Sequence, residues 1–289
     1  MISLFYFRIA ITTNGILISH SDDGLPKKRL PMNASFRTSM GSLWRALLSA
    51  SLALLAVASQ AASVSVAVAS NFAAPMKRIA TEFEHDTGHK AVLSFGATGQ
   101  FHAQIKNGAP FELLLAADAQ TPLKLEQEGL TLAGTRRSYA IGRLVLWSRT
   151  PGLVDEAGAV LRTGKFEKLA LANPKLAPYG AAAWQVLAQL GLSDTLRPRI
   201  VEAANISQAL QFVASGNAAL GFVAMAQVFE GGRLREGSAW VVPEQMHTPL
   251  RQDLVLLLPG KGKPAAQALL TYMQSPKARA IIAAFGYTL

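Results

Sequence analysis

Two turns, about thirty residues apart, each place small hydroxyl or amide side chains just after an apolar strand-like run. Residues 64–69 form the first run, which ends at Ser70 and Asn71, and residues 91–95 form the second, which is followed closely by Thr98. A helix-patterned stretch follows each turn, so the N–H groups of the helix start point at whatever lies above the strand end. Neither turn contains Lys or Arg. The pattern predicts that neutral donors and helix dipoles hold a small, fully ionised oxyanion that must later be released.

Similar turn chemistry recurs in the second half of the chain. Residues 199–203 form another strand-like run, which ends before Asn205 and Ile206, and Tyr179 stands where a further helix-patterned stretch begins. Any one of these residues is also typical of an ordinary helix cap. Recurrence at several strand ends favours a ligand site, because open α/β folds bind ligands at the carboxyl edge of a parallel sheet. Tyr179 can offer both its phenol and its N–H as donors.

Sequence patterns that would indicate catalysis or a metal centre are missing. The chain has no Walker loop, no dinucleotide-binding glycine pattern, no Gly-x-Ser-x-Gly elbow and no cysteine. His85 and His89 stand four apart, but Gly88 would end the helix between them and no third ligand is near. Asp118 follows a strand-like run and is interpreted as a cap or a hinge contact. We therefore expect a protein that is not an enzyme and has no cofactor and no metal cation.

The charge of the chain does not favour a nucleic-acid partner. The formal net charge is +10, but residues 1–61 hold six basic and two acidic residues, which leaves +6 for the remainder. Basic residues there are scattered singly, apart from the pairs Lys77-Arg78 and Arg136-Arg137, with no basic stripe between aromatic residues. We therefore expect no nucleic-acid binding. Hydrophobic residues make up 50% of the 289 residues, enough for the cores of two ordinary domains.

The N-terminal segment is typical of an export signal. Arg37 and Arg45 are followed by an apolar stretch, residues 46–58, and Ser59-Gln60-Ala61 has small residues where a signal peptidase cleaves. The stretch is shorter than the roughly 20 residues that cross a bilayer as a helix. We therefore predict a secretory signal peptide and a mature protein that begins near Ala62.

Residues 1–31 do not fit a normal signal peptide, because they place a further segment, with Asp22, Asp23 and three basic residues at 27–29, ahead of the apolar stretch. Translation that starts at Met32 or Met40 would account for them. A genuine N-terminal extension is the alternative. We leave residues 1–61 out of the fold prediction.

The mature chain alternates strand-like and helix-like stretches, as α/β folds with parallel sheets do. Residues 73–87 read as a helix that ends before Gly88, and residues 253–258 read as a strand that returns late in the chain. The pattern predicts that the chain leaves a first domain near Gly142, builds a second domain, and returns to the first near Pro243. We predict two lobes, each a mostly parallel sheet flanked by helices, with two hinge crossings and a ligand cleft between them. Their predicted extents are residues 62–142 plus 244–289, and residues 143–243.

Several of these segments together carry a family resemblance. The most specific is Gly-Ala-Pro-x-x-Leu-x-x-x-Ala-Asp, which ends at Asp118. With this stretch, residues 67–72, 94–99, 172–174, 178–180, 220–223 and 285–287 resemble the periplasmic molybdate-binding proteins of ABC importers. The resemblance extends over essentially all of residues 62–289.

The resemblance implies a class II periplasmic binding protein that closes on molybdate or tungstate through hydrogen bonds alone. It implies a periplasmic location, delivery to an ABC permease at the inner membrane, and a monomer. By position it implies five ligand-binding residues: Ser70, Asn71, Thr98, Tyr179 and, through its backbone N–H, Ile206. Some members of the family use a tyrosine where this chain has Ala224, so Tyr179 or Asn71 is expected to supply the missing donor.

Three alternatives stay open at this point. One is a binding protein for sulfate, thiosulfate or another oxyanion; the second is the effector domain of a transcription regulator on the same fold; the third is a hydrolase or transferase that uses Asp118. Donors without acceptors favour a fully deprotonated dianion over hydrogen phosphate, whose O–H would face another donor. Sulfate also satisfies this condition, so its exclusion would depend on cavity size, which a sequence does not display.

Overall fold

The computed structural model describes residues 8–12, 15–19 and 61–289. The chain divides into two compact units, Met1–Ser59 and Gln60–Leu289. In the first unit, strands Arg8–Thr12 (β1) and Gly15–Ser19 (β2) pair antiparallel. Except for Ala61, the predicted signal peptide and the two alternative start residues lie outside the described residues, so they stay predictions.

Five strands of the second unit form a mixed sheet in the order β4-β3-β5-β14-β6. Their bounds are Ser63–Ala69 (β3), Lys90–Gly96 (β4), Leu113–Leu115 (β5), Arg137–Gly142 (β6) and Leu250–Leu256 (β14). β3 pairs parallel with β4 and β5, whereas β14 pairs antiparallel with β5 and β6. Parallel pairing places Ala69 opposite Gly96. The turns that contain Ser70 and Thr98 therefore begin side by side at one edge of this sheet.

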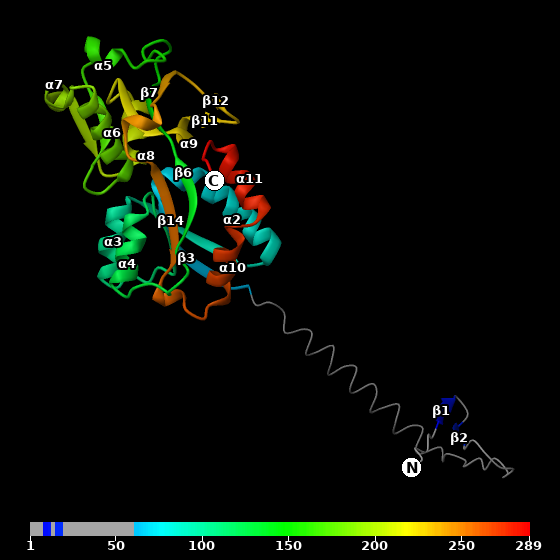
Figure 1. Ribbon diagram of the computed structural model, residues 1–289. Helices are drawn as coiled ribbons and strands as arrows, with labels where there is room; N and C mark the ends of the chain where they lie inside the picture. Colours follow the sequence, from blue (N-terminus) through cyan, green and yellow to red (C-terminus); the bar gives the residue numbers. More distant parts are fainter. Residues whose placement is uncertain (1–7, 13–14, 20–60) are drawn as a thin grey trace, which may run out of the picture. The chain divides into compact units, whose positions relative to one another are not determined.

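Helices cover both faces of this first sheet (Figure 1). One face carries Ala73–Thr87 (α2), Pro264–Tyr272 (α10) and Pro276–Ala284 (α11), and the other carries Thr98–Lys106 (α3) and Gln120–Gln127 (α4). Val66 and Val68 share a buried cluster with α2 and α10, whereas Ala67 shares one with α3 and α4. Successive strand residues point to opposite faces, so a strand covered on both faces must be apolar at nearly every position. This requirement explains the apolar run of residues 64–69.

The second mixed sheet has the order β13-β7-β10-β8-β9. Its strands are Leu144–Ser148 (β7), Leu169–Ala172 (β8), Ile200–Ala203 (β9), Leu220–Ala224 (β10) and Ser238–Val241 (β13). β8 pairs parallel with β9 and β10, so the segments that follow β8 and β9 leave the same edge. The helices that follow these two strands are Pro178–Gln189 (α6) and Ile206–Ala214 (α8), which begin with the predicted Tyr179 and Ile206 turns.

Shorter elements complete the second unit. They are the helices Val160–Thr163 (α5), Ser193–Leu196 (α7) and Met225–Val228 (α9), the hairpin Phe229–Glu230 (β11) and Arg233–Leu234 (β12), and the 3-10 turns Ser70–Phe72 (η1), Arg197–Arg199 (η2), Glu244–Met246 (η3) and Leu258–Gly260 (η4). Within the described part of the chain, no helix combines the length and apolarity needed to span a membrane.

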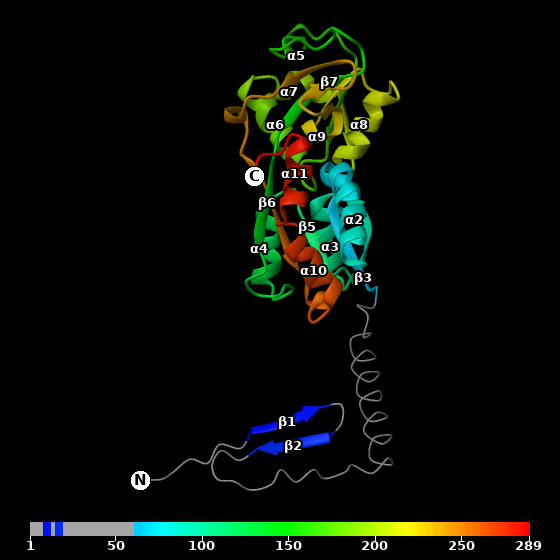
Figure 2. The same ribbon diagram turned by 90° about the vertical axis from the view of Figure 1, so that its right-hand side faces the viewer.

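The chain passes between the two sheets twice. β6 ends at Gly142 and the next strand, β7, belongs to the second sheet; β13 is the last strand of that sheet, and β14 returns to the first. The C-terminal residues come back to the same place, because Ile141 and Thr288 exchange backbone hydrogen bonds of 2.7 and 3.1 Å. Figure 2 shows the C-terminus beside β6. The first crossing is therefore held by both β14 and the C-terminal segment.

The structure differs from the sequence prediction mainly near these crossings. α2 has the predicted bounds, residues 73–87. The sheets are mixed, with parallel pairing confined to β4-β3-β5 and to β10-β8-β9. β6 and β13 were not predicted as strands, and β14 begins at Leu250, three residues earlier than residue 253. These strands pair with partners distant in the sequence, which a local pattern does not reveal. The predicted lobe boundaries stay a prediction.

We expect Gly180→Ala to lower the free energy of unfolding by about 1–3 kcal/mol, measured by urea denaturation. A methyl group on Gly180 would lie 2.1 Å from the carbonyl oxygen of Ala172, so α6 would have to move away from β8. Helix propensity alone would change stability in the opposite direction, by up to about 1 kcal/mol. A variant more stable than the wild type would show that α6 does not need this close approach.

Candidate functional site

The turn that contains Ser70 and Asn71 follows a strand of the first sheet and contacts the start of α8, which follows a strand of the second sheet. Ser70 and Asn71 lie in η1 directly after β3, and 5% and 2% of their surfaces are exposed. The hydroxyl of Ser207 donates to the carbonyl oxygen of Ser70 at 3.1 Å, and the hydroxyl of Ser70 lies 3.4 Å from Oδ1 of Asn205. The Ser70 turn and the start of α8 are therefore joined in both directions. Figure 2 shows the upper end of α2, which follows η1, next to α8.

Thr98 begins α3, directly beside the first turn. Its hydroxyl oxygen accepts the N–H of Ala117 at 2.9 Å, so the hydroxyl proton stays available for another acceptor. The next residue, Gly99, donates its N–H to the carbonyl oxygen of Leu176 at 2.9 Å. A side chain on Gly99 would lie 3.0 Å from the Cα atom of Leu176. Glycine at this position therefore permits the close approach of α3 to the segment before α6.

Ile206 is the first residue of α8, and its N–H has no acceptor within the helix because it is one of the first four. The N-cap, Asn205, accepts the N–H groups of Ser207 and Gln208, each at 3.0 Å. The cap therefore holds the helix start in place and leaves the N–H of Ile206 as a donor. This is the arrangement that favours an anion at a helix N-terminus.

Tyr179 lies in the first turn of α6, after Pro178 at the helix start. Its side chain is 1% exposed, and its hydroxyl oxygen accepts the Nε2 amide of Gln252 at 3.1 Å. Gln252 lies on β14 of the first sheet. Tyr179, at the start of a helix beside the second sheet, is therefore hydrogen-bonded to a residue of the first sheet. The Ser70 turn makes the same kind of connection between the two sheets.

All five predicted residues lie where the two sheets' strand ends meet. Ala69 and Ala97, which precede Ser70 and Thr98, belong to the same buried cluster as Tyr179 and Ile206. Among the described residues, no lysine or arginine side chain hydrogen-bonds to any of the predicted side chains. The site therefore offers hydroxyl, amide and backbone donors without a fixed positive charge. Whether each of the five contacts a ligand stays a prediction.

Three residues that the sequence prediction did not include support this site. Gln252 is fully buried, and its Oε1 lies 3.0 Å from Nδ2 of Asn71 and 2.9 Å from the hydroxyl of Tyr139. Tyr287 donates to the carbonyl oxygen of Asn71 at 2.9 Å and lies 3.1 Å from its Nδ2. Gln252 stands between Arg251 and Asp253, just before the strand predicted for residues 253–258, so no local signal in the sequence marks it as part of the site.

Burial raises the pKa of the phenols in this network. For Tyr139, Tyr179 and Tyr287, desolvation is the largest cause, because it disfavours the phenolate. Other tyrosines nearby raise the pKa of Tyr139 and Tyr179 further. All three phenols therefore stay protonated near neutral pH and keep their ability to donate.

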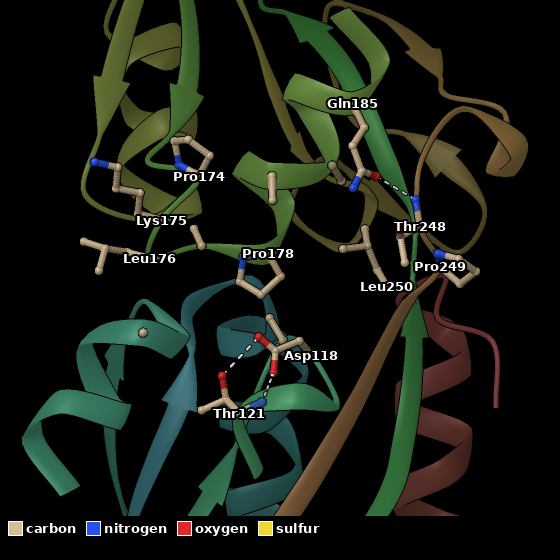
Figure 3. Close-up of a pocket in the computed structure, with 15 residues that line it drawn as sticks. Asp118, Thr121, Pro174, Lys175, Leu176, Pro178, Gln185, Thr248, Pro249 and Leu250 are labelled. Atoms are coloured by element: carbon tan, nitrogen blue, oxygen red, sulfur yellow. Dashed lines mark hydrogen bonds between the residues drawn. The ribbon is translucent and has the colours of Figure 1, made fainter. Parts of the chain in front are cut away.

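A crevice of about 300 Å³ opens beside the predicted site (Figure 3). Asp118 and Thr121 lie on one side of it and Pro174 and Pro178 on the other. The two carboxylate oxygens of Asp118 accept the N–H of Thr121 at 2.7 Å and its hydroxyl at 3.2 Å. Burial raises the pKa of Asp118, and the bonds from Thr121 partly offset the shift. Asp118 thus bonds the start of α4 from the residue before its N-cap, Ala119.

The structure also places Ala224 and the two histidines, His85 and His89, that the sequence analysis singled out. Ala224, where some members of the family have a tyrosine, is buried and donates its N–H to Oε1 of Gln227 at 2.9 Å. Nδ1 of His85 lies 2.9 Å from Asp86, whereas Nδ1 of His89 accepts the N–H of Ala62 at 3.3 Å. No group of three potential metal ligands occurs in the described part of the chain.

The fold and the facing strand ends are those of a solute-binding protein, and comparison with known proteins agrees. Residues 64–288 match the family described as bacterial extracellular solute-binding protein. The chain belongs to this family, and its similar relatives include molybdate-binding proteins. It is 58% identical to the molybdate-binding protein ModA of Azotobacter vinelandii over 248 residues, 86% of this chain and 98% of that protein. It is 47% identical to ModA of Rhodobacter capsulatus over 235 residues, 81% of this chain and 91% of that protein.

Solved structures give the same result. The periplasmic molybdate-binding protein of Azotobacter vinelandii superposes with a TM-score of 0.76 at 44% identity, covering 78% of this chain and 99% of that chain. The predicted two-sheet binding-protein fold and the predicted family are thereby confirmed. The sulfate-binding protein SubI of Mycobacterium tuberculosis H37Rv shares the fold, with a TM-score of 0.63 at 13% identity over 78% of this chain and 86% of that chain.

We expect the protein to lose stability as the pH rises above about 10, the ordinary pKa of a tyrosine phenol. The folded state raises the pKa of the three buried phenols, so stability is fully present below the unfolded-state pKa and is lost as the unfolded chain releases protons that the folded chain retains. Each phenol contributes up to about 1.4 kcal/mol per pH unit. Urea unfolding at pH 8, 10 and 11 measures the slope, and Tyr287→Phe should reduce it. An unchanged slope in that variant would contradict the assignment.

Proposed function

We propose that this chain is the solute-binding component of an ABC importer and that it captures molybdate or tungstate between its two lobes. The observation that carries the proposal is the meeting of uncharged donors from both sheets, in a chain that is 58% identical to a protein named molybdate-binding protein ModA. No cofactor is needed, because binding and release of an oxyanion require only hydrogen bonds.

The proposed lobes are residues 62–142 plus 244–289 and residues 143–243. The observed crossings support this division, because the strands of the first sheet and those of the second fall within these ranges. The chain passes from one lobe to the other at two hinge segments, which allow the lobes to open and close around a ligand. A closed form would present a composite surface to the permease, so that binding is linked to transport.

The proposed ligand contacts come from the five predicted residues. The hydroxyls of Ser70 and Thr98 donate from the first lobe, together with the backbone N–H groups of the turns that contain them and Asn71. Tyr179 donates its phenol from the second lobe, and Ile206 donates its N–H at the start of α8. The hydrogen bonds of Asn205 and Ala117 support the assignment for Ile206 and Thr98, because they hold these donors without using the protons assigned to the ligand. The Ser70 hydroxyl donates to Oδ1 of Asn205 at 3.4 Å, and an anion would replace this acceptor.

This set of donors gives the selectivity for charge state. A fully deprotonated tetrahedral dianion can accept every bond, whereas the O–H of hydrogen phosphate would face a donor and leave both groups unpaired. The absence of a bonded lysine or arginine among the described residues of the site lowers the barrier to release. Discrimination between molybdate and sulfate is assigned to the size of the closed site.

We propose that the protein works in the periplasm as a monomer, exported through a signal peptide within residues 1–61. The similarity to periplasmic molybdate-binding proteins supports the compartment. N-terminal sequencing of the protein recovered from a periplasmic fraction tests the export step. A mature N-terminus near Ala62 is expected, and a cytoplasmic protein that retains Met1 or Met32 would contradict it.

Competition calorimetry with molybdate, tungstate and sulfate tests the proposed ligand. We expect molybdate and tungstate to bind and displace each other, and sulfate at the same concentration to displace neither. Elemental analysis of protein purified from molybdate-supplied periplasm should find molybdenum in the protein. Tight binding of sulfate would instead favour a sulfate transporter component, and binding of none of the three would reject the proposal.

Ser70→Ala and Thr98→Ala should each weaken molybdate binding by about 5- to 150-fold, which corresponds to about 1–3 kcal/mol for a donor removed from a buried charge. Isothermal titration calorimetry measures the change. Thr81→Ala is a matched control, because Thr81 is exposed on α2 and its hydroxyl bonds only the carbonyl oxygen of Lys77. Unchanged affinity in both site variants would place the ligand elsewhere.

A further inference from the structure

We propose that Gln252 is a positioning residue for the proposed oxyanion site: its amide turns the hydroxyl proton of Tyr179 toward the ligand and joins the two lobes at the hinge. This inference rests on the proposed function, because it concerns how one of the proposed donors is oriented. Gln252 lies on β14, a strand of the first sheet, whereas Tyr179 lies at the start of α6, beside the second.

The direction of the hydrogen bonds carries the first step. Nε2 of Gln252 donates to the hydroxyl oxygen of Tyr179 at 3.1 Å. Its Oε1 accepts Nδ2 of Asn71 at 3.0 Å and the hydroxyl of Tyr139 at 2.9 Å. A phenol has a single proton, so an oxygen that already accepts from Gln252 donates its own proton elsewhere. In this structure the neighbouring hydroxyl of Tyr287 accepts that proton, and a bound anion oxygen would accept it in place of Tyr287.

The same network decides what Asn71 can offer. Its two Nδ2 protons go to Oε1 of Gln252 and to the hydroxyl oxygen of Tyr287, which in turn donates to the carbonyl oxygen of Asn71. The side-chain amide of Asn71 is thus committed to this network, and its backbone N–H is the donor left for a ligand. Gln252 consequently sets the donor state of two proposed ligand residues, one from each lobe.

The space around the contact is kept by a glycine. A Cβ atom on Gly142 would lie 2.0 Å from the hydroxyl oxygen of Tyr179 and 2.6 Å from Nε2 of Gln252. Gly142 is the last residue of β6, where the chain leaves the first sheet. A larger residue at this crossing would separate the two side chains. The Gln252–Tyr179 hydrogen bond therefore requires a glycine in the backbone of this crossing.

The neutral charge of Gln252 is also part of the inference. The side chain is fully buried, so a carboxylate there would repel a dianion across a medium of low dielectric constant and would accept the Tyr179 proton. An amide of the same shape donates to Tyr179 and adds no charge. A neutral amide thus holds the tyrosine while preserving its ability to donate.

A double-mutant cycle on the full-length mature protein tests the inference, with molybdate as the titrant in calorimetry. We expect Tyr179→Phe and Gln252→Met each to weaken binding about 10-fold, and the double variant to bind about as weakly as the weaker single variant. Such coupling means that Gln252 acts through the Tyr179 hydroxyl. If the two factors multiply to about 100-fold, Gln252 acts independently of Tyr179 and the inference is overturned.

Asp253→Asn is the matched control. Asp253 is the next residue on β14, is also buried, and accepts hydrogen bonds from Arg136 at 3.0 Å and from Ser138 at 2.6 Å, neither of which bonds Gln252 or Tyr179. We expect it to lower thermal stability but to change molybdate affinity by less than about twofold, alone or with Tyr179→Phe. Coupling of this variant to Tyr179 would show that any disturbance of β14 has the same effect, and would remove the support for Gln252.

Gly142→Ala gives a second test that keeps both polar side chains and decides the question if Gln252→Met fails to fold, as judged by near-UV circular dichroism. The added methyl should weaken molybdate binding about 10-fold in the wild-type background and less in the Tyr179→Phe background, which lacks the nearer of the two clashing polar atoms. Equal losses in both backgrounds would overturn the inference. Failure of the wild type to bind molybdate or tungstate would instead reject the proposed function, so the two failures are distinguishable.

Discussion

The hydrogen bond from the Gln252 amide to the Tyr179 hydroxyl joins a strand of one sheet to a helix beside the other, with both side chains out of contact with water. A buried polar group without a partner is unfavourable by about 1–3 kcal/mol, so each donor and acceptor in this region depends on the others. Asn71, Tyr139 and Tyr287 complete the set. The two sheets' sides of the molecule therefore meet through uncharged polar contacts, and in the proposed function the same contacts define which protons serve a ligand.

This constraint also explains the uncharged nature of the proposed site. A guanidinium at its centre would bind a dianion strongly but would have to be desolvated when the lobes close, and it would hinder release. Helix N-termini and hydroxyls provide a weaker, directional attraction that needs no buried cation. Thr98 and Ile206 illustrate the arrangement, because neighbouring backbone and cap groups orient them while leaving a proton free. The positive net charge of the chain can still attract small anions over a longer range.

The hinge region links the site to the rest of the fold. β6 and β14 both run from the first sheet to the crossings, and Thr288 pairs with Ile141 beside Gly142. Tyr287, one residue earlier in the C-terminal segment, contacts Asn71 in the first turn. The end of the chain is thus packed against both a hinge strand and the site.

The sequence by itself determined the class of the fold, the strand ends that carry the donors and the family, because each depends on short patterns such as the apolar run of residues 64–69 followed by Ser70. Helix α2 and the turns at Thr98, Tyr179 and Ile206 follow from local punctuation by proline, glycine and capping residues. Tertiary structure alone decided that β6 and β13 are strands, that the sheets are mixed, and that Gln252 and Tyr287 belong beside the site. These features depend on pairing and burial between residues far apart in the chain, and no local pattern encodes which distant side chain will satisfy a buried amide or phenol.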